Sequence, residues 1–116
     1  MGAGKTEIIV SGGATTNSYV YNTVNVLGYG ETSVFFQNNG TAGSGIAVTV
    51  LGYPAYESLP ITSAYVILVS GDVVESGKVY LYSVSDSYEG LGVGYKSAGT
   101  NFSGRVTIVV TRKRRQ

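Results

Sequence analysis

Short stretches in which apolar and polar residues alternate run along the whole chain. None sustains the three-to-four-residue spacing of an amphipathic helix, whereas alternation with period two indicates a β-strand with one buried face. Gly, Asn, Ser and Pro separate the stretches, as they do at turns. The pattern predicts strands at residues 6–10, 18–26, 31–38, 45–51, 64–69, 78–84, 88–96 and 104–112. We therefore expect an all-β chain that folds as a single antiparallel β-sandwich or jelly-roll-like domain of seven or eight strands.

The alternation also assigns the faces of the strands. Two strands have an unbroken apolar face and should form the core, through Ile46, Val48 and Val50 and through Val106, Ile108 and Val110. Elsewhere the apolar face lies opposite tyrosines, which places Tyr19, Tyr21, Tyr80 and Tyr82 on outer faces. Tyrosine gives a large contact area at low entropic cost, so these four predict a subunit-contact surface. The alternative is cross-strand aromatic pairing on a solvated face.

Glycine occupies every second position of the strand predicted at 88–96. Gly90, Gly92 and Gly94 alternate with Leu91, Val93 and Tyr95, so one face of this strand carries no side chains. The spacing is not that of a dinucleotide-binding loop, because Tyr95 occupies the position of the last glycine in G-x-G-x-x-G and no helix begins there. Glycine in a strand often marks close approach by another group. We expect a groove there, filled either by tyrosines of the same domain or by a neighbouring subunit or ligand.

The two ends of the chain differ from its middle. Residues 1–17 consist of a short strand, with Ile8, Ile9 and Val10, followed by a segment rich in Ser, Gly, Ala and Thr that predicts a flexible linker. Such a strand could pair with the sheet edge of a neighbouring subunit. Residues 18–111 form the predicted sandwich domain.

Residues 112–116 predict a basic tail, because Arg112, Lys113, Arg114 and Arg115 are half of the eight lysines and arginines. A tail of this kind attracts polyanions in a salt-sensitive manner or simply solubilises a strand end. If the chain contacts nucleic acid, we expect the contact through this tail only; four charges without an aromatic platform do not predict specific recognition.

Composition limits the chemistry that the chain can perform. The 116 residues contain no cysteine and no histidine, and only 13% are charged. Disulfides, cysteine nucleophiles, Cys/His metal sites and histidine bases are excluded on that basis. No stretch predicts a membrane-spanning helix or an ordinary signal peptide. We expect no cofactor and no membrane insertion.

Two short motifs are similar to parts of known functional sites. Residues 2–6 read GAGKT, the end of a phosphate-binding loop, but a β-branched strand follows where a helix is required. Asp86 and Glu89 are carboxylates close in sequence, and a solvated turn explains them more simply than a glycosidase or calcium site does. Neither motif predicts an enzyme.

From about Tyr29 onward, the order of features resembles small β-sandwich structural proteins of phage and archaeal virus particles. The resemblance rests on GETSVFFQNNGT, GIAVTVLGYP, YEGLGVGYKSAGT and SGRVTIVV. It implies a head-decoration, fibre or tail-associated protein that contacts copies of itself and other shell proteins, in a virion or another extracellular assembly.

We therefore expect a non-enzymatic structural protein that acts through contacts between subunits. Two alternatives stay open on the residues alone. One is a carbohydrate-binding module that stacks sugars on the exposed tyrosines, and the other is a subunit of an extracellular fibre or pilus.

Overall fold

The computed structural model describes residues 4–41, 43–54, 65–84, 88–99 and 104–114. They form eight strands and no helix, so none of these residues belongs to a helix that could span a membrane. The strands are β1 (Lys5–Ala14), β2 (Val20–Asn25), β3 (Tyr29–Asn38), β4 (Ile46–Tyr53), β5 (Val66–Val74), β6 (Val79–Val84), β7 (Gly90–Ser97) and β8 (Arg105–Arg114). Each of the eight predicted strands is present.

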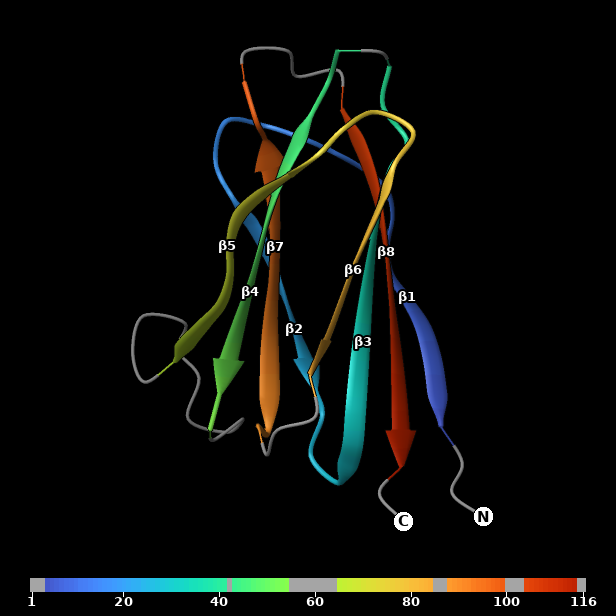
Figure 1. Ribbon diagram of the computed structural model, residues 1–116, viewed down its shortest axis with the longest axis vertical. Coiled ribbons are helices and arrows are strands. Elements are labelled where there is room, and N and C mark those ends of the chain that lie inside the picture. The colour runs from blue at the N-terminus through green and yellow to red at the C-terminus, as the bar shows by residue number, and fades with distance from the viewer. Residues whose placement is uncertain (1–3, 42, 55–64, 85–87, 100–103, 115–116) are drawn as a thin grey trace.

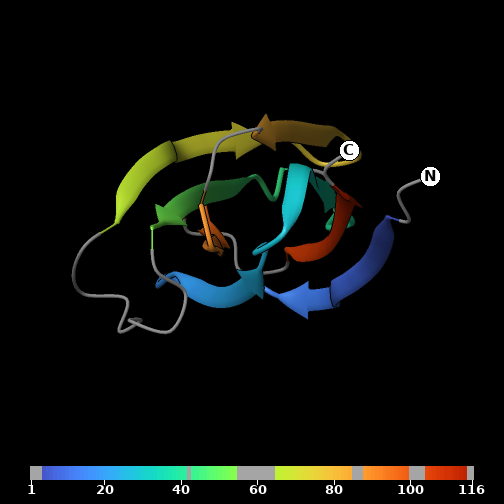
Figure 2. The ribbon, with the colours of Figure 1, turned by 90° about the horizontal axis from the view of Figure 1, so that it is seen from below.

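The strands form two four-stranded antiparallel sheets (Figure 1). Sheet A has the order β1-β8-β3-β6 and sheet B the order β2-β7-β4-β5. Apart from β4 and β5, the strands that pair are therefore not consecutive in sequence, as in the Greek-key connections of a jelly roll. Seen from below, β5 and β6 follow one another along one side, and β1 and β2 along the opposite side (Figure 2). The predicted all-β sandwich is confirmed.

The core lies between the sheets and consists mainly of β-branched residues. Val48, Val50, Val106, Ile108 and Val110 are fully buried there, as the alternation predicts. Deep burial of this apolar surface is the main stabilising contribution to the sandwich.

β1 and β5 extend furthest beyond their predicted ends, because glycine-containing bulges continue them. Ser70, Gly71 and Asp72 follow the strand predicted at 64–69 but lie inside β5, where Gly71 has a φ of 72° and the pairing with β4 shifts register. The predicted linker also begins inside a strand, since β1 runs to Ala14 through Gly12, whose φ is 64°. A bulge adds a residue to one strand without ending the ladder, which sequence punctuation does not reveal.

Candidate subunit-contact surface

The outer face of sheet A carries a row of apolar side chains that crosses all four strands. Ile8 pairs with Val109, Val109 with Phe35, and Phe35 with Leu81. Directly paired residues of antiparallel strands point to the same face of a sheet. We call these four residues the apolar row. Ile8 and Leu81 are 62% and 54% exposed, whereas Phe35 and Val109 are half-buried.

A shallow hollow of about 350 Å³ lies beside the apolar row. Its lining comes from three strands: Phe35, Gln37, Val79, Thr107 and Val109. Val79 is 57% exposed, so it extends the apolar surface along β6. A hollow with apolar walls on an open sheet face can receive an apolar side chain from another molecule.

On the other side of the apolar row lies a row of hydroxyls. The Oγ1 atoms of Thr6 and Thr111 are 3.3 Å apart, and the Oγ atoms of Ser33 and Ser83 are 2.9 Å apart. Register places Thr111 beside Ser33, so the four residues cross the sheet together. Within each of the two pairs the hydroxyls hydrogen-bond to each other, and none of the four carries a charge. This part of the face therefore has little electrostatic repulsion toward another surface.

On the outer face of sheet B, tyrosine rings of the same chain cover the glycine strand β7. A Cβ added to Gly94 would lie 2.5 Å from the ring of Tyr21, and one added to Gly92 would lie 3.1 Å from the ring of Tyr53. The glycines of β7 thus leave room for aromatic rings to lie against the backbone. Tyr53 is only 1% exposed. Of the two fillings expected for the glycine groove, the geometry is that of tyrosines from the same domain.

Further tyrosines extend this cover. The ring of Tyr65 lies 6.0 Å from that of Tyr53, and the ring of Tyr19 lies 5.6 Å from that of Tyr21. The Nζ atom of Lys96 lies 5.2 Å from the centre of the Tyr19 ring, within range of a cation–π contact. Burial, and then the neighbouring phenols, raise the pKa values of Tyr21 and Tyr53. Their phenols therefore lose their protons only at a higher pH than an ordinary tyrosine does.

The predicted facing of β6 is wrong. Tyr80 and Tyr82 pack against the core, while Val79 and Leu81 point outward. Pairing decides this, because Tyr80 lies opposite buried Phe36 and Tyr82 opposite buried Val34. At this edge position the Tyr80 hydroxyl donates a 2.6 Å hydrogen bond to Asp72 of sheet B. A phenol suits the rim of the core, since its ring packs inside while its hydroxyl reaches a polar partner.

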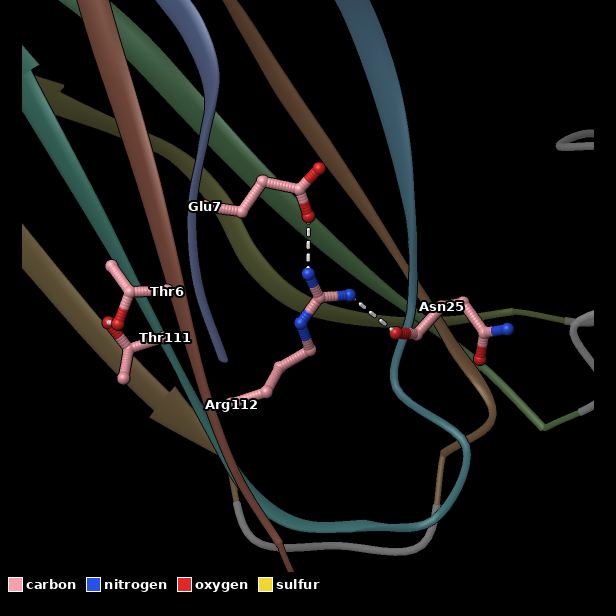
Figure 3. Close-up of polar contacts among 5 residues, drawn as sticks. All are labelled: Thr6, Glu7, Asn25, Thr111 and Arg112. Atoms are coloured by element: carbon pink, nitrogen blue, oxygen red, sulfur yellow. Dashed lines mark hydrogen bonds and ion pairs between the residues drawn. The ribbon is translucent and has the colours of Figure 1, made fainter. Parts of the chain in front are cut away.

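The predicted basic tail is also corrected, because β8 extends to Arg114. Arg112 is 5% exposed, forms an ion pair with Glu7 and donates a 2.8 Å hydrogen bond to the Asn25 carbonyl (Figure 3). A buried guanidinium with these partners is not available to polyanions. It holds β1 of sheet A and the end of β2 of sheet B in place.

The other predicted tail residues differ from Arg112. Lys113 is exposed on β8 and lies 3.8 Å from Glu31. Arg114 is the last residue of β8, and Arg115 lies outside the described residues. Lys113, Arg114 and Arg115 therefore remain as predicted polyanion contacts.

Among the predicted contact residues of β1, only Ile8 belongs to the outer face of sheet A. Ile9 falls at a register shift, and Val10 packs inward against the core. In this single chain β1 pairs with its own β8.

Gly90, the first predicted contact glycine of β7, pairs with Asn25 on one side and with Tyr53 on the other, and it is buried.

The remaining sequence motifs do not come together as a site. Lys5 and Thr6 of GAGKT begin β1, where they belong to a strand and not to the start of a helix. Asp86 lies outside the described residues. Within the described ranges, no three His, Cys, Asp or Glu residues gather as a metal site would require.

Sequence reasoning missed the apolar row. Its signal is present, because Val34, Phe35 and Phe36 are consecutive and apolar, so both faces of β3 must be apolar. What the sequence lacks is the register, which aligns Phe35 with Ile8, Val109 and Leu81 from three distant segments.

Comparison with known proteins adds a likeness of fold. No protein-family model matches the chain, and no curated protein sequence matches it significantly. A solved structure of Bacillus endospore appendages, which form disulfide-linked pili, has a TM-score of 0.51 and 10% sequence identity, covering 100% of this chain and 92% of that one. A mitogen from Yersinia pseudotuberculosis has a TM-score of 0.35 and 9% sequence identity, covering 86% of this chain and 88% of that one. The chain is therefore an eight-stranded β-sandwich whose fold is similar to that of a pilus-forming appendage protein.

Proposed function

We propose that this chain is a non-enzymatic structural subunit that works by contact with other subunits in an extracellular assembly. The observation that carries the proposal is the outer face of sheet A. It presents an apolar row and an uncharged hydroxyl row on a rigid sheet, with Ile8, Val79 and Leu81 each more than half exposed. Contiguous exposed apolar surface of this kind is typical of protein–protein contact sites.

Composition supports a non-enzymatic role. The sequence has neither histidine nor cysteine, the residues that most often act as bases and nucleophiles near neutral pH. The described carboxylates with a defined contact have structural partners: Glu7 pairs with Arg112, Glu31 with Lys113, and Asp72 accepts from Tyr80. Such pairs hold strands together, so these three carboxylates have a structural role.

A fibre or pilus subunit is the form of assembly that the fold likeness favours. The appendages to which the chain is similar form disulfide-linked pili. These 116 residues contain no cysteine, so contacts between copies of this chain would be made without disulfides. Non-covalent assembly then requires a large and well-packed contact, since a specific interface buries on the order of 1,200 Å² or more.

A virion component is the second form, supported by the sequence resemblance and by the jelly-roll strand order, which recurs in viral capsid proteins. Exchange of β1 between copies stays a prediction within either form. The swapped strand would make the same contacts with a neighbouring β8, including the ion pair between Glu7 and Arg112.

The carbohydrate-binding alternative loses part of its support. Sugar stacking requires open aromatic faces, but Tyr80 and Tyr82 pack against the core and Tyr21 covers Gly94. Tyr19 is the remaining predicted platform, and it already lies beside Lys96.

Electron microscopy and light scattering of the purified protein test the proposal. We expect the mass to rise with protein concentration and ordered particles or fibres to form. High salt should weaken this assembly little, because the exposed face is mainly apolar. A protein that stays monomeric at every concentration and retains glycans on an array would contradict the proposal.

A further inference from the structure

The outer face of sheet A has a pattern that is complementary to itself. β8 and β3 lie at its centre, with β1 and β6 on either side. Moving across the centre line exchanges Val109 for Phe35 and Ile8 for Leu81, so within the apolar row each apolar residue corresponds to another apolar residue. The same exchange relates Thr111 to Ser33, two hydroxyl residues.

The charged residues follow the same pattern. Lys113 on β8 and Glu31 on β3 occupy corresponding positions on either side of the centre line. Both side chains are substantially exposed, at 69% and 46%. The exchange therefore relates a positive charge to a negative one.

We propose that the outer face of sheet A packs face to face against the same face of a second copy, related by a two-fold axis that runs between β3 and β8. This inference rests on the proposed function and names its contact surface and its partner. Phe35 of one copy then lies against Val109 of the other, Leu81 against Ile8, and Lys113 against Glu31. An isologous contact satisfies such pairs twice, once on each side of the axis.

The size of the face agrees with this partner. Four strands about 4.8 Å apart and up to ten residues long, at about 3.3 Å per residue, cover roughly 600 Å². Two copies would bury about 1,200 Å², which reaches the lower end of specific interfaces. A smaller partner would leave part of the apolar row in water.

A two-fold contact closes on itself, so the dimer is the building unit of this assembly. Growth into a larger assembly would use another surface of the dimer.

The main test compares two outward-facing residues of matched exposure in sedimentation equilibrium. Leu81 is 54% exposed on sheet A, and Val73 is 52% exposed on sheet B. Leu81→Lys should weaken dimerisation by about 100-fold or more, since it places a charge in an apolar contact twice per dimer. Val73→Lys should leave the dissociation constant unchanged. Both residues are exposed, so we expect both variants to fold, and circular dichroism would check this.

A second experiment tests the position of the axis. Glu31→Lys gives one copy two adjacent positive charges, and Lys113→Glu gives another copy two negative ones. Each variant alone should dimerise about tenfold more weakly than the unmodified chain, because like charges face each other. A mixture of the two should form heterodimers that are at least as tight as the unmodified dimer.

The outcomes separate the inference from the proposed function. If the unmodified protein assembles and Leu81→Lys assembles equally well, the inference is overturned and the proposed function stands. If the mixed charge variants gain nothing over either alone, the two-fold axis between β3 and β8 is overturned. A protein that is monomeric throughout contradicts both.

Discussion

The two outer faces of this sandwich use large side chains in opposite ways. On sheet B, the rings of Tyr21 and Tyr53 lie against Gly94 and Gly92, and Tyr53 is almost completely buried. On sheet A, Phe35 and Val109 stand beside the exposed residues Ile8 and Leu81. The surface over β7 of sheet B is therefore covered within the chain, and exposed apolar side chains of this sheet lie on its edge strand β5. On sheet A, the apolar row crosses the whole sheet and remains available to another molecule.

The difference originates in the central strands. β7 alternates glycine with core residues, so its outer side is bare backbone on which a ring can rest. β8 alternates core residues with Thr and Val, whose branched side chains fill the outer side and keep neighbouring rings from lying flat. A glycine strand therefore predicts an internally covered face, and a β-branched strand predicts an open one.

Removal of an aromatic ring should give the largest difference in stability between the two faces. We expect Tyr53→Ala to lower the free energy of unfolding by about 3–5 kcal/mol, because it empties a fully buried site. Phe35→Ala, on the open face, should cost about 1 kcal/mol, since half-buried side chains lose less apolar contact. Urea unfolding measures both, in dilute protein carrying Leu81→Lys so that assembly does not contribute. Equal losses at the two sites would show that the faces do not differ.

Filling the glycine groove should have a smaller effect. Gly94→Val places a side chain where the Tyr21 ring lies, and overpacking of this kind costs about 1–3 kcal/mol. Thr23→Val on the exposed outer face of β2 is the matched control, with an expected change within about 0.5 kcal/mol. Thermal unfolding by circular dichroism measures the two variants. A stable Gly94→Val protein would mean that Tyr21 does not need the bare backbone.

The smallest effect concerns the rim where the two sheets meet. The hydrogen bond to Asp72, followed by burial and the nearby Asp72 and Tyr82 groups, raises the pKa of Tyr80 to about 12, from an ordinary value of 10.0. The folded chain therefore keeps this proton when the unfolded chain has lost it. The resulting stabilisation is complete below about pH 10 and disappears as the pH rises toward 12.

Tyr80→Phe checks this pH dependence, because phenylalanine has no proton to lose. Its stability should fall less steeply than that of the unmodified chain between pH 10 and 12. Absorbance near 295 nm should show one fewer tyrosine titrating at the high end. Identical alkaline unfolding curves for the two proteins would argue against the Tyr80–Asp72 bond.

Local pattern predicted much of this molecule. The eight strands, the core faces of β4 and β8, and the bare glycine face of β7 all follow from residues adjacent in sequence. The predictions that failed concern β6, whose alternation fits either facing, and Arg112, whose burial depends on Glu7 at the other end of the chain. Continuation of β5 through Gly71 was missed because a bulge and a turn use the same residues.

The sequence by itself determined that this chain is an all-β sandwich with a valine-rich core and a strand bare on one side, because a period of two fixes side-chain direction within a strand. Only the tertiary structure decided which strands are neighbours. Register between distant segments aligned Ile8, Val109, Phe35 and Leu81 into one row and enclosed Arg112 between the two sheets. Alternation is a local property of the backbone, whereas pairing depends on burial of the whole chain and therefore cannot be derived from any single stretch.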